Sequence, residues 1–204
     1  MKRFLLLFLA TVVTAWSASA QLSVSQLRTE HLTDPVGIGE RRPLLSWEVS
    51  DASRRGVTQS AYEIRVKSGG RTVWRTGKVA SAESAGVFYD GTPLTSDTRY
   101  TWQVRVWDDR GKASAWSRPA FWRTGLFDVG EWQARWIEPA VSDDLAAMFR
   151  RTFRVTKPVA EATVYVTAHG IYEASVNGHR VSDDLLTPGW TASVSYTHLT
   201  LPTI

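Results

Sequence analysis

The stretch that decides the fold is Arg99–Asp108, which reads RYTWQVRVWD. Its side chains alternate between two faces with the period of two that is typical of a β-strand. One face carries Tyr100, Trp102, Val104 and Val106. The other face carries Thr101, Gln103, Arg105 and Trp107. We therefore predict a strand whose first face lies in an apolar core and whose second face is solvated.

Turn signals on both sides of this strand divide the chain into short segments. Asp108–Gly111 is predicted to be a tight turn, because Asp favours turn geometry and Gly tolerates a positive φ. The next strand is expected to run through Trp116 and Phe121. Further strands are predicted upstream, at Leu44–Val49, Ala61–Val66 and Thr72–Trp74. About seven strands in about 100 residues, without sustained helical periodicity, indicate a β-sandwich.

Residues 21–127 resemble a fibronectin type III or immunoglobulin-like sandwich. The resemblance rests on Leu94, Thr98 and Tyr100 ahead of the strand and on Gly111 and Ser114–Ser117 after it. It implies that Tyr100 is a tyrosine corner, with its ring in the core and its hydroxyl bonded to backbone near Leu94. Such sandwiches serve many functions, so this resemblance predicts a fold only.

A second block is predicted beyond a boundary at Gly125–Gly130, where Trp132 and Trp136 open a new pattern. Alternating residues predict strands at Phe149–Val155 and Ala162–Ala168. A hairpin is predicted from strands at 172–176 and 179–181. The two residues between them, Asn177 and Gly178, both tolerate the positive φ of a type I′ turn.

The second block resembles bacterial α-L-rhamnosidases of glycoside hydrolase family 78. The motifs that carry this resemblance are Met148–Phe153, Ala168–Glu173, Val176–Gly178 and Leu186–Thr191. Together with the first sandwich, the resemblance covers roughly residues 24 to 191. It implies that 128–191 is the first part of a jelly-roll β-sandwich, which needs about eight strands and is therefore incomplete here.

The same resemblance implies an activity that lies outside these residues. In that family a large (α/α) toroid carries an acidic pair, which hydrolyses terminal rhamnose with inversion, and nothing in this sequence matches the toroid. We expect no catalytic residue, cofactor or metal in the 204 residues. The sequence departs from the family at Ala192, and 192–204 resembles a translated sequencing adapter, so we expect a non-native tail.

Residues 1–20 have the pattern of a secretory signal peptide. Lys2 and Arg3 precede the largely apolar run Phe4–Trp16, which is too short for the ~20 residues of a membrane-spanning helix. Ala18 and Ala20 are the small residues that signal peptidase accepts, so cleavage is expected to leave Gln21 as the N-terminus. We therefore expect an exported protein, periplasmic or extracellular, with no membrane attachment after cleavage.

Composition excludes several other classes of protein. There are 24 basic and 20 acidic residues, and removal of Lys2 and Arg3 leaves 22 against 20, which is no nucleic-acid-binding charge. Ten Trp residues argue against a disordered chain. The sequence has no Cys, so disulfides, thiol chemistry and cysteine metal sites are excluded.

The acidic residues are expected to have local roles. Inverting glycosidases need two carboxyl groups about 6.5–9.5 Å apart, whereas side chains adjacent in sequence usually diverge. Asp108-Asp109, Asp143-Asp144 and Asp183-Asp184 are therefore interpreted as turn or loop residues, and Glu173 as a packing or domain-contact residue.

Histidines and tryptophans remain as candidate ligand-binding residues. His31, His169, His179 and His198 lack metal-ligand spacing and are interpreted as structural or surface residues. Trp107 and Trp116 are expected to stack with Arg105 or Arg118 through cation-π contact. Trp190 is the candidate sugar-contact or domain-contact residue.

Two functions remain open from the sequence. The first is the accessory N-terminal region of an exported α-L-rhamnosidase, which acts on rhamnose-containing glycans through the full-length parent and packs against its catalytic domain. The alternative is a stand-alone secreted carbohydrate-binding or adhesion protein of two β-sandwiches.

Overall fold

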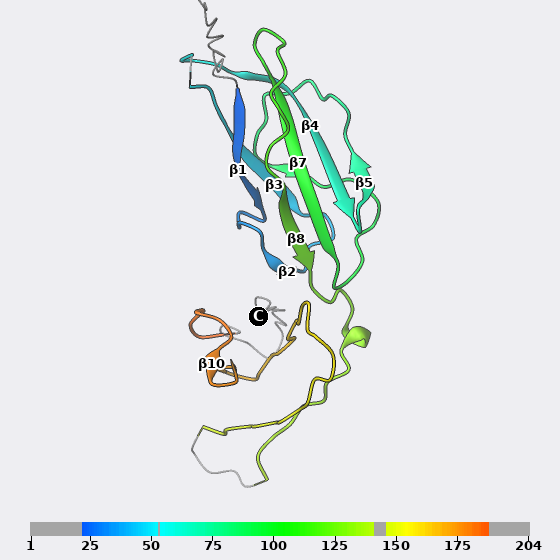
Figure 1. Cartoon of the computed structure of the whole chain (residues 1–204), viewed down its shortest axis with the longest axis vertical. Coiled ribbons are helices and arrows are strands. Elements are labelled where there is room, and N and C mark those ends of the chain that lie inside the picture. The colour runs from blue at the N-terminus through cyan, green and yellow to red at the C-terminus, as the bar shows by residue number, and fades with distance from the viewer. Residues whose placement is uncertain (1–21, 53, 141–145, 188–204) are drawn as a thin grey trace, which may run out of the picture.

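The first block is a sandwich of two β-sheets, seen in a computed structural model that describes residues 22–52, 54–140 and 146–187. One sheet has the order β1-β3-β6 and the other β2-β8-β7-β4-β5 (Figure 1). The strands are β1 (Ser23–Thr29), β2 (Val36–Ile38), β3 (Leu44–Ser50), β4 (Gln59–Ser68), β5 (Arg71–Arg75), β6 (Val87–Phe88), β7 (Arg99–Asp108) and β8 (Ala120–Thr124). The all-β sandwich expected from the sequence is confirmed. No helix among the described residues is long and apolar enough to cross a membrane.

Strand β7 has the predicted bounds, and its predicted core face is buried. Tyr100, Trp102, Val104 and Val106 are each 4% exposed or less. β7 pairs antiparallel with β4 from Gln59–Asp108 to Ser68–Tyr100, at the centre of the five-stranded sheet. The other face is half-buried rather than solvated, because long basic and aromatic side chains of neighbouring segments lie across it.

Tyr100 forms the tyrosine corner that the resemblance implied. Its hydroxyl accepts a hydrogen bond from the backbone N–H of Thr95 at 3.0 Å, one residue beyond Leu94. Its ring stacks on Trp122 with centroids 5.4 Å apart. The corner thus joins β7, β8 and the connection before β7.

The segment before β8 was wrongly predicted as a strand. β8 begins only at Ala120, so Trp116 lies in a connection. Ser114 and Ser117 accept the β7 backbone N–H groups of Val106 and Val104 with their hydroxyl oxygens, at 3.0 and 3.1 Å. Side-chain hydroxyls therefore replace the carbonyls that a partner strand would supply.

Among its described residues, the second block contains the predicted hairpin and little other regular structure. β9 (Ser175–Val176) pairs with β10 (His179–Arg180), and Asn177 and Gly178 between them have φ of 51° and 83°. The predictions for Phe149–Val155 and Ala162–Ala168 were wrong, because neither range forms a strand. A strand needs a hydrogen-bonded neighbour, and neither range joins a sheet among the described residues.

Candidate functional site

The second block contacts the sandwich through Arg123, at the end of β8. Its guanidinium lies between Asp97, at 2.8 Å, and Glu161, at 2.6 Å, and its side chain is only 14% exposed. Burial would lower the pKa of Arg123, but hydrogen bonds and charge from Asp97 and Glu161 raise it above its ordinary value. Arg123 is therefore a permanent cation that joins one carboxylate of each block.

Tyr165 strengthens the same contact from the second block. Its hydroxyl donates a hydrogen bond to Oδ1 of Asp97 at 2.6 Å, and its ring meets Trp132 edge-on at 6.4 Å. Burial, followed by the hydrogen bond and charge of Asp97, raises the pKa of Tyr165 to about 12. The phenol thus stays a donor at physiological pH. We call Asp97, Arg123, Glu161 and Tyr165 the junction cluster.

The chain between the blocks is tied to the sandwich as well. Glu131 ends the short 3₁₀ helix η1 (Val129–Glu131), and its Oε2 accepts hydrogen bonds from the Ser96 hydroxyl at 2.6 Å and the Phe127 N–H at 2.9 Å. Arg41 pairs with Asp128 at 3.2 Å. The predicted boundary at Gly125–Gly130 is thus an ordered turn.

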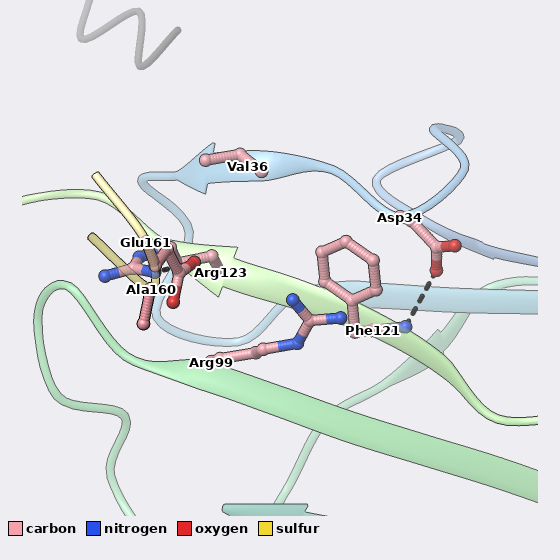
Figure 2. A pocket seen from close by; sticks show the side chains of 7 residues that line it. All are labelled: Asp34, Val36, Arg99, Phe121, Arg123, Ala160 and Glu161. Atoms are coloured by element: carbon pink, nitrogen blue, oxygen red, sulfur yellow. Dashed lines mark hydrogen bonds and ion pairs between the residues drawn. The ribbon is translucent and has the colours of Figure 1, made fainter. Parts of the chain in front are cut away.

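An open cavity of about 520 Å³ lies beside the junction cluster, between β2, β7, β8 and the second block (Figure 2). Arg99 lies over the ring of Phe121, with its guanidinium carbon 3.6 Å from the ring centroid. Asp34 accepts the backbone N–H of Phe121 through Oδ1 at 2.8 Å. Val36, Ala160 and Glu161 complete the wall with Arg123.

Asp108 and Asp184, from two of the acidic pairs in the sequence, do not line this cavity and make local contacts. Oδ1 of Asp108 accepts the backbone N–H groups of Arg110 and Lys112, as expected for a turn. Asp184 accepts the Ser182 hydroxyl at 2.6 Å. The remaining pair, Asp143-Asp144, lies outside the described residues.

Glu173 and His169 also make local contacts. Glu173 lies 3.4 Å from Arg180 across the hairpin. His169 stacks on Trp136 with ring centroids 4.1 Å apart. Within the described ranges, no group of three or more His, Asp or Glu side chains could hold a metal ion. Ala18, Ala20, Trp190 and His198 fall outside the described residues.

The predicted cation-π stack is present on β7, with a different partner. The guanidinium carbons of Arg65 and Arg105 lie 4.2 and 4.9 Å from the centroid of the Trp116 ring, and that of Arg105 also lies 5.0 Å from the centroid of the Trp107 ring. Arg65, rather than Arg118, completes the row because it projects from the adjacent strand β4. The guanidinium of Arg65 also donates a hydrogen bond to Oε1 of Gln103, so it has an acceptor within the same sheet.

Sequence reasoning missed the junction cluster and the cavity. From sequence alone, a charged residue at the end of a strand is expected to be exposed to solvent. No local motif identifies Arg123 or Asp97 as a contact residue. The one available signal was Asp97 in a turn next to Thr98, which indicates turn geometry rather than a contact between blocks.

Models of known protein families match both blocks of the chain. A family model described as "Rha78A-like, N-terminal immunoglobulin domain" matches residues 24–128. A second, described as "Alpha-L-rhamnosidase N-terminal domain", matches residues 157–200. The two matches follow each other in the order that the sequence motifs indicated.

Whole relatives support the same comparison. The α-L-rhamnosidase of Streptomyces avermitilis is 37% identical over 190 residues, covering 79% of this chain and 18% of that protein. The α-L-rhamnosidase structure from Dictyoglumus thermophilum has a TM-score of 0.75 at 32% identity, over 83% of this chain and 22% of that one. The Streptomyces avermitilis enzyme complexed with L-rhamnose has a TM-score of 0.56 at 35% identity, over 81% and 19%. The chain therefore spans about a fifth of the length of the relatives it matches.

Proposed function

Because this chain belongs to the family of Rha78A-like N-terminal immunoglobulin domains, we propose that it acts as the accessory N-terminal region of an exported α-L-rhamnosidase. The observation that carries the proposal is the order of the two family matches in this chain, 24–128 followed by 157–200. Its similarity to α-L-rhamnosidases over both blocks supports the same proposal. The parent would hydrolyse terminal α-L-rhamnose from glycosides or polysaccharides. Its acid and base would come from residues beyond those aligned here.

The second block supports a packing role against the rest of that parent. Its large apolar side chains are widely exposed, among them Met148 at 93%, Leu185 at 77% and Phe153 at 73%. Within the described part of the sandwich, only Leu32 and Phe88 are comparable. Many exposed large apolar side chains in one segment are typical of a contact surface. We propose that it packs against the catalytic region of the parent.

The enzyme assignment is tested on the native gene. Long-read sequencing through the codon for Thr191 should show a continuing reading frame, and the encoded protein should hydrolyse 4-nitrophenyl α-L-rhamnoside. The α-D-mannoside is the matched control and should be a poor substrate. A stop codon after Ile204 in native DNA, or a long protein without rhamnosidase activity, would contradict the proposal.

Export is proposed on the pattern of residues 1–20. Expression in a bacterial host followed by N-terminal sequencing should give a mature chain that begins at Gln21. Replacement of Ala18 and Ala20 by Leu should leave the precursor uncleaved. Retention of Lys2 and Arg3 in the unmodified protein would contradict the assignment.

A further inference from the structure

The cavity between the blocks combines fixed hydrogen-bonding groups with an apolar wall, and we propose that it is a binding subsite for a neutral sugar. Its donor is the guanidinium of Arg99, which makes no ion pair with any described residue. Contact with the ring of Phe121 holds that guanidinium in place without neutralising it. A ligand can therefore take its N–H groups.

Two carboxylates supply acceptors on either side of Arg99. Oδ1 of Asp34 is held by the Phe121 N–H, and Oε1 of Glu161 is held by Arg123. The second oxygen of each carboxylate has no partner in the described part of the chain. Hydroxyl groups of a sugar could donate to these oxygens while a ring or hydroxyl oxygen accepts from Arg99.

The charges alternate along the cavity, which selects against ions. Asp34 lies at one end and Glu161 at the other, with Arg99 and Phe121 between them (Figure 2). The junction adds Asp97 and Arg123, so three carboxylates oppose two guanidinium groups. A carboxylate or phosphate would meet excess negative charge, and a cation would meet Arg99. A neutral polyhydroxyl ligand meets neither penalty.

The size and the apolar wall fit the same class of ligand. Ligand pockets are typically about 300–1,000 Å³, and the cavity holds about 520 Å³, which leaves room for a mono- or disaccharide. Val36, Ala160 and the Phe121 ring offer apolar contact for the C–H face of a ring. A lipid would leave the charged groups without partners.

The identity of the sugar rests on the proposed function, which makes L-rhamnose the natural probe. The ¹⁵N-labelled 204-residue chain is titrated with L-rhamnose, and the amide shifts of Asp34, Val36, Arg99 and residues 121–123 are followed. We expect saturable shifts there, with Kd on the order of millimolar for a shallow monosaccharide site. D-Galacturonate, an anionic sugar of similar size, should bind more weakly. Absence of saturable shifts, or tighter binding of galacturonate, would overturn the subsite.

Two variants test the assigned residues. Arg99→Ala should weaken binding about tenfold, the loss of one hydrogen bond to a charged donor. Arg71→Ala, an exposed arginine on β5, is the matched control and should bind as the unmodified chain does. Val36→Trp fills the cavity from the half-exposed edge strand and should abolish the shifts. Equal binding by Arg99→Ala or Val36→Trp contradicts the proposal.

Failure of the subsite and failure of the enzyme assignment give different results. Hydrolysis of 4-nitrophenyl α-L-rhamnoside by the long protein, together with no shifts in the 204-residue chain, removes the subsite alone. Saturable shifts together with no hydrolysis by the long protein remove the enzyme assignment alone.

Discussion

The hydroxyl of Tyr165 lies 2.6 Å from Oδ1 of Asp97, so a residue of the second block donates a hydrogen bond into a turn of the sandwich. Asp97 adopts a positive φ of 49° in that turn, and the same oxygen accepts from Arg123 at 2.8 Å. One carboxylate oxygen thus receives a neutral and a charged donor. This contact holds Tyr165 of the second block against the turn that precedes β7.

Tyr165→Phe should loosen the second block without unfolding the sandwich. The change removes one hydrogen bond and leaves the Arg123–Asp97 pair in place, so the expected loss is about 1 kcal/mol. Hydrogen exchange of residues 157–168 should accelerate, while exchange in β4 and β7 should stay unchanged. Unaltered exchange at 157–168 would show that Tyr165 does not hold the block.

Tyr100→Phe is the complementary change, because it acts inside the sandwich. The Thr95 N–H loses its acceptor, and an unsatisfied backbone donor costs about 1–2 kcal/mol. Urea denaturation should show a lower midpoint with an unchanged slope. Hydrogen exchange of residues 157–168 should increase no more than the overall loss of stability requires. This separates the variant from Tyr165→Phe.

Local pattern accounts for what could be predicted. Alternation over Arg99–Asp108 specifies both the strand and its buried face, because the two depend on adjacent residues only. The strand predicted through Trp116 after the Asp108–Gly111 turn was wrong at Trp116, because serine hydroxyls replace a partner strand there. The contact of Arg123 with Glu161 joins residues 38 positions apart, and no local signal specifies such a pairing.

Glu63 should make stability depend on pH in the acidic range. Its side chain is 3% exposed between Arg75 and Arg105, each 2.6 Å away. Burial alone would raise the pKa of Glu63, but hydrogen bonds from Arg75 and Arg105 and their charges lower it below its ordinary value. A lowered pKa gives stability that is fully present above the pKa of the unfolded chain and is lost as pH falls through that of the folded chain.

This effect is measured by comparing the free energy of unfolding of the unmodified chain and of Glu63→Gln across the acidic pH range. The unmodified chain should lose free energy of unfolding from roughly pH 5 downward, given an ordinary glutamate pKa of about 4.3. Glu63→Gln should be less stable at pH 7 and show a flatter profile, because no carboxyl titrates there. Parallel stability profiles for the two proteins would rule out Glu63 as the source of the pH dependence.

Trp116→Leu tests whether the cation-π row stabilises the sandwich. Leu keeps apolar cover over the half-buried face but removes the ring that Arg65 and Arg105 contact. Partly exposed cation-π contacts contribute about 0.5–1 kcal/mol each, so urea denaturation should show a loss of about 1–2 kcal/mol. A variant as stable as the unmodified chain would indicate that apolar cover alone suffices.

The two blocks of the 204-residue chain should differ sharply in local stability. The sandwich has a buried aromatic and aliphatic core, whereas 146–187 exposes most of its large apolar side chains and contains only the short β9–β10 hairpin as sheet. Regions with few buried contacts open at low free energy. Amides of β4 and β7 should therefore exchange orders of magnitude more slowly than those of 148–187. In the longer protein, packing against the catalytic region should protect Phe149 and Phe153. Slow, cooperative exchange of 148–187 in the 204-residue chain would contradict this prediction and would favour an independently folded second module.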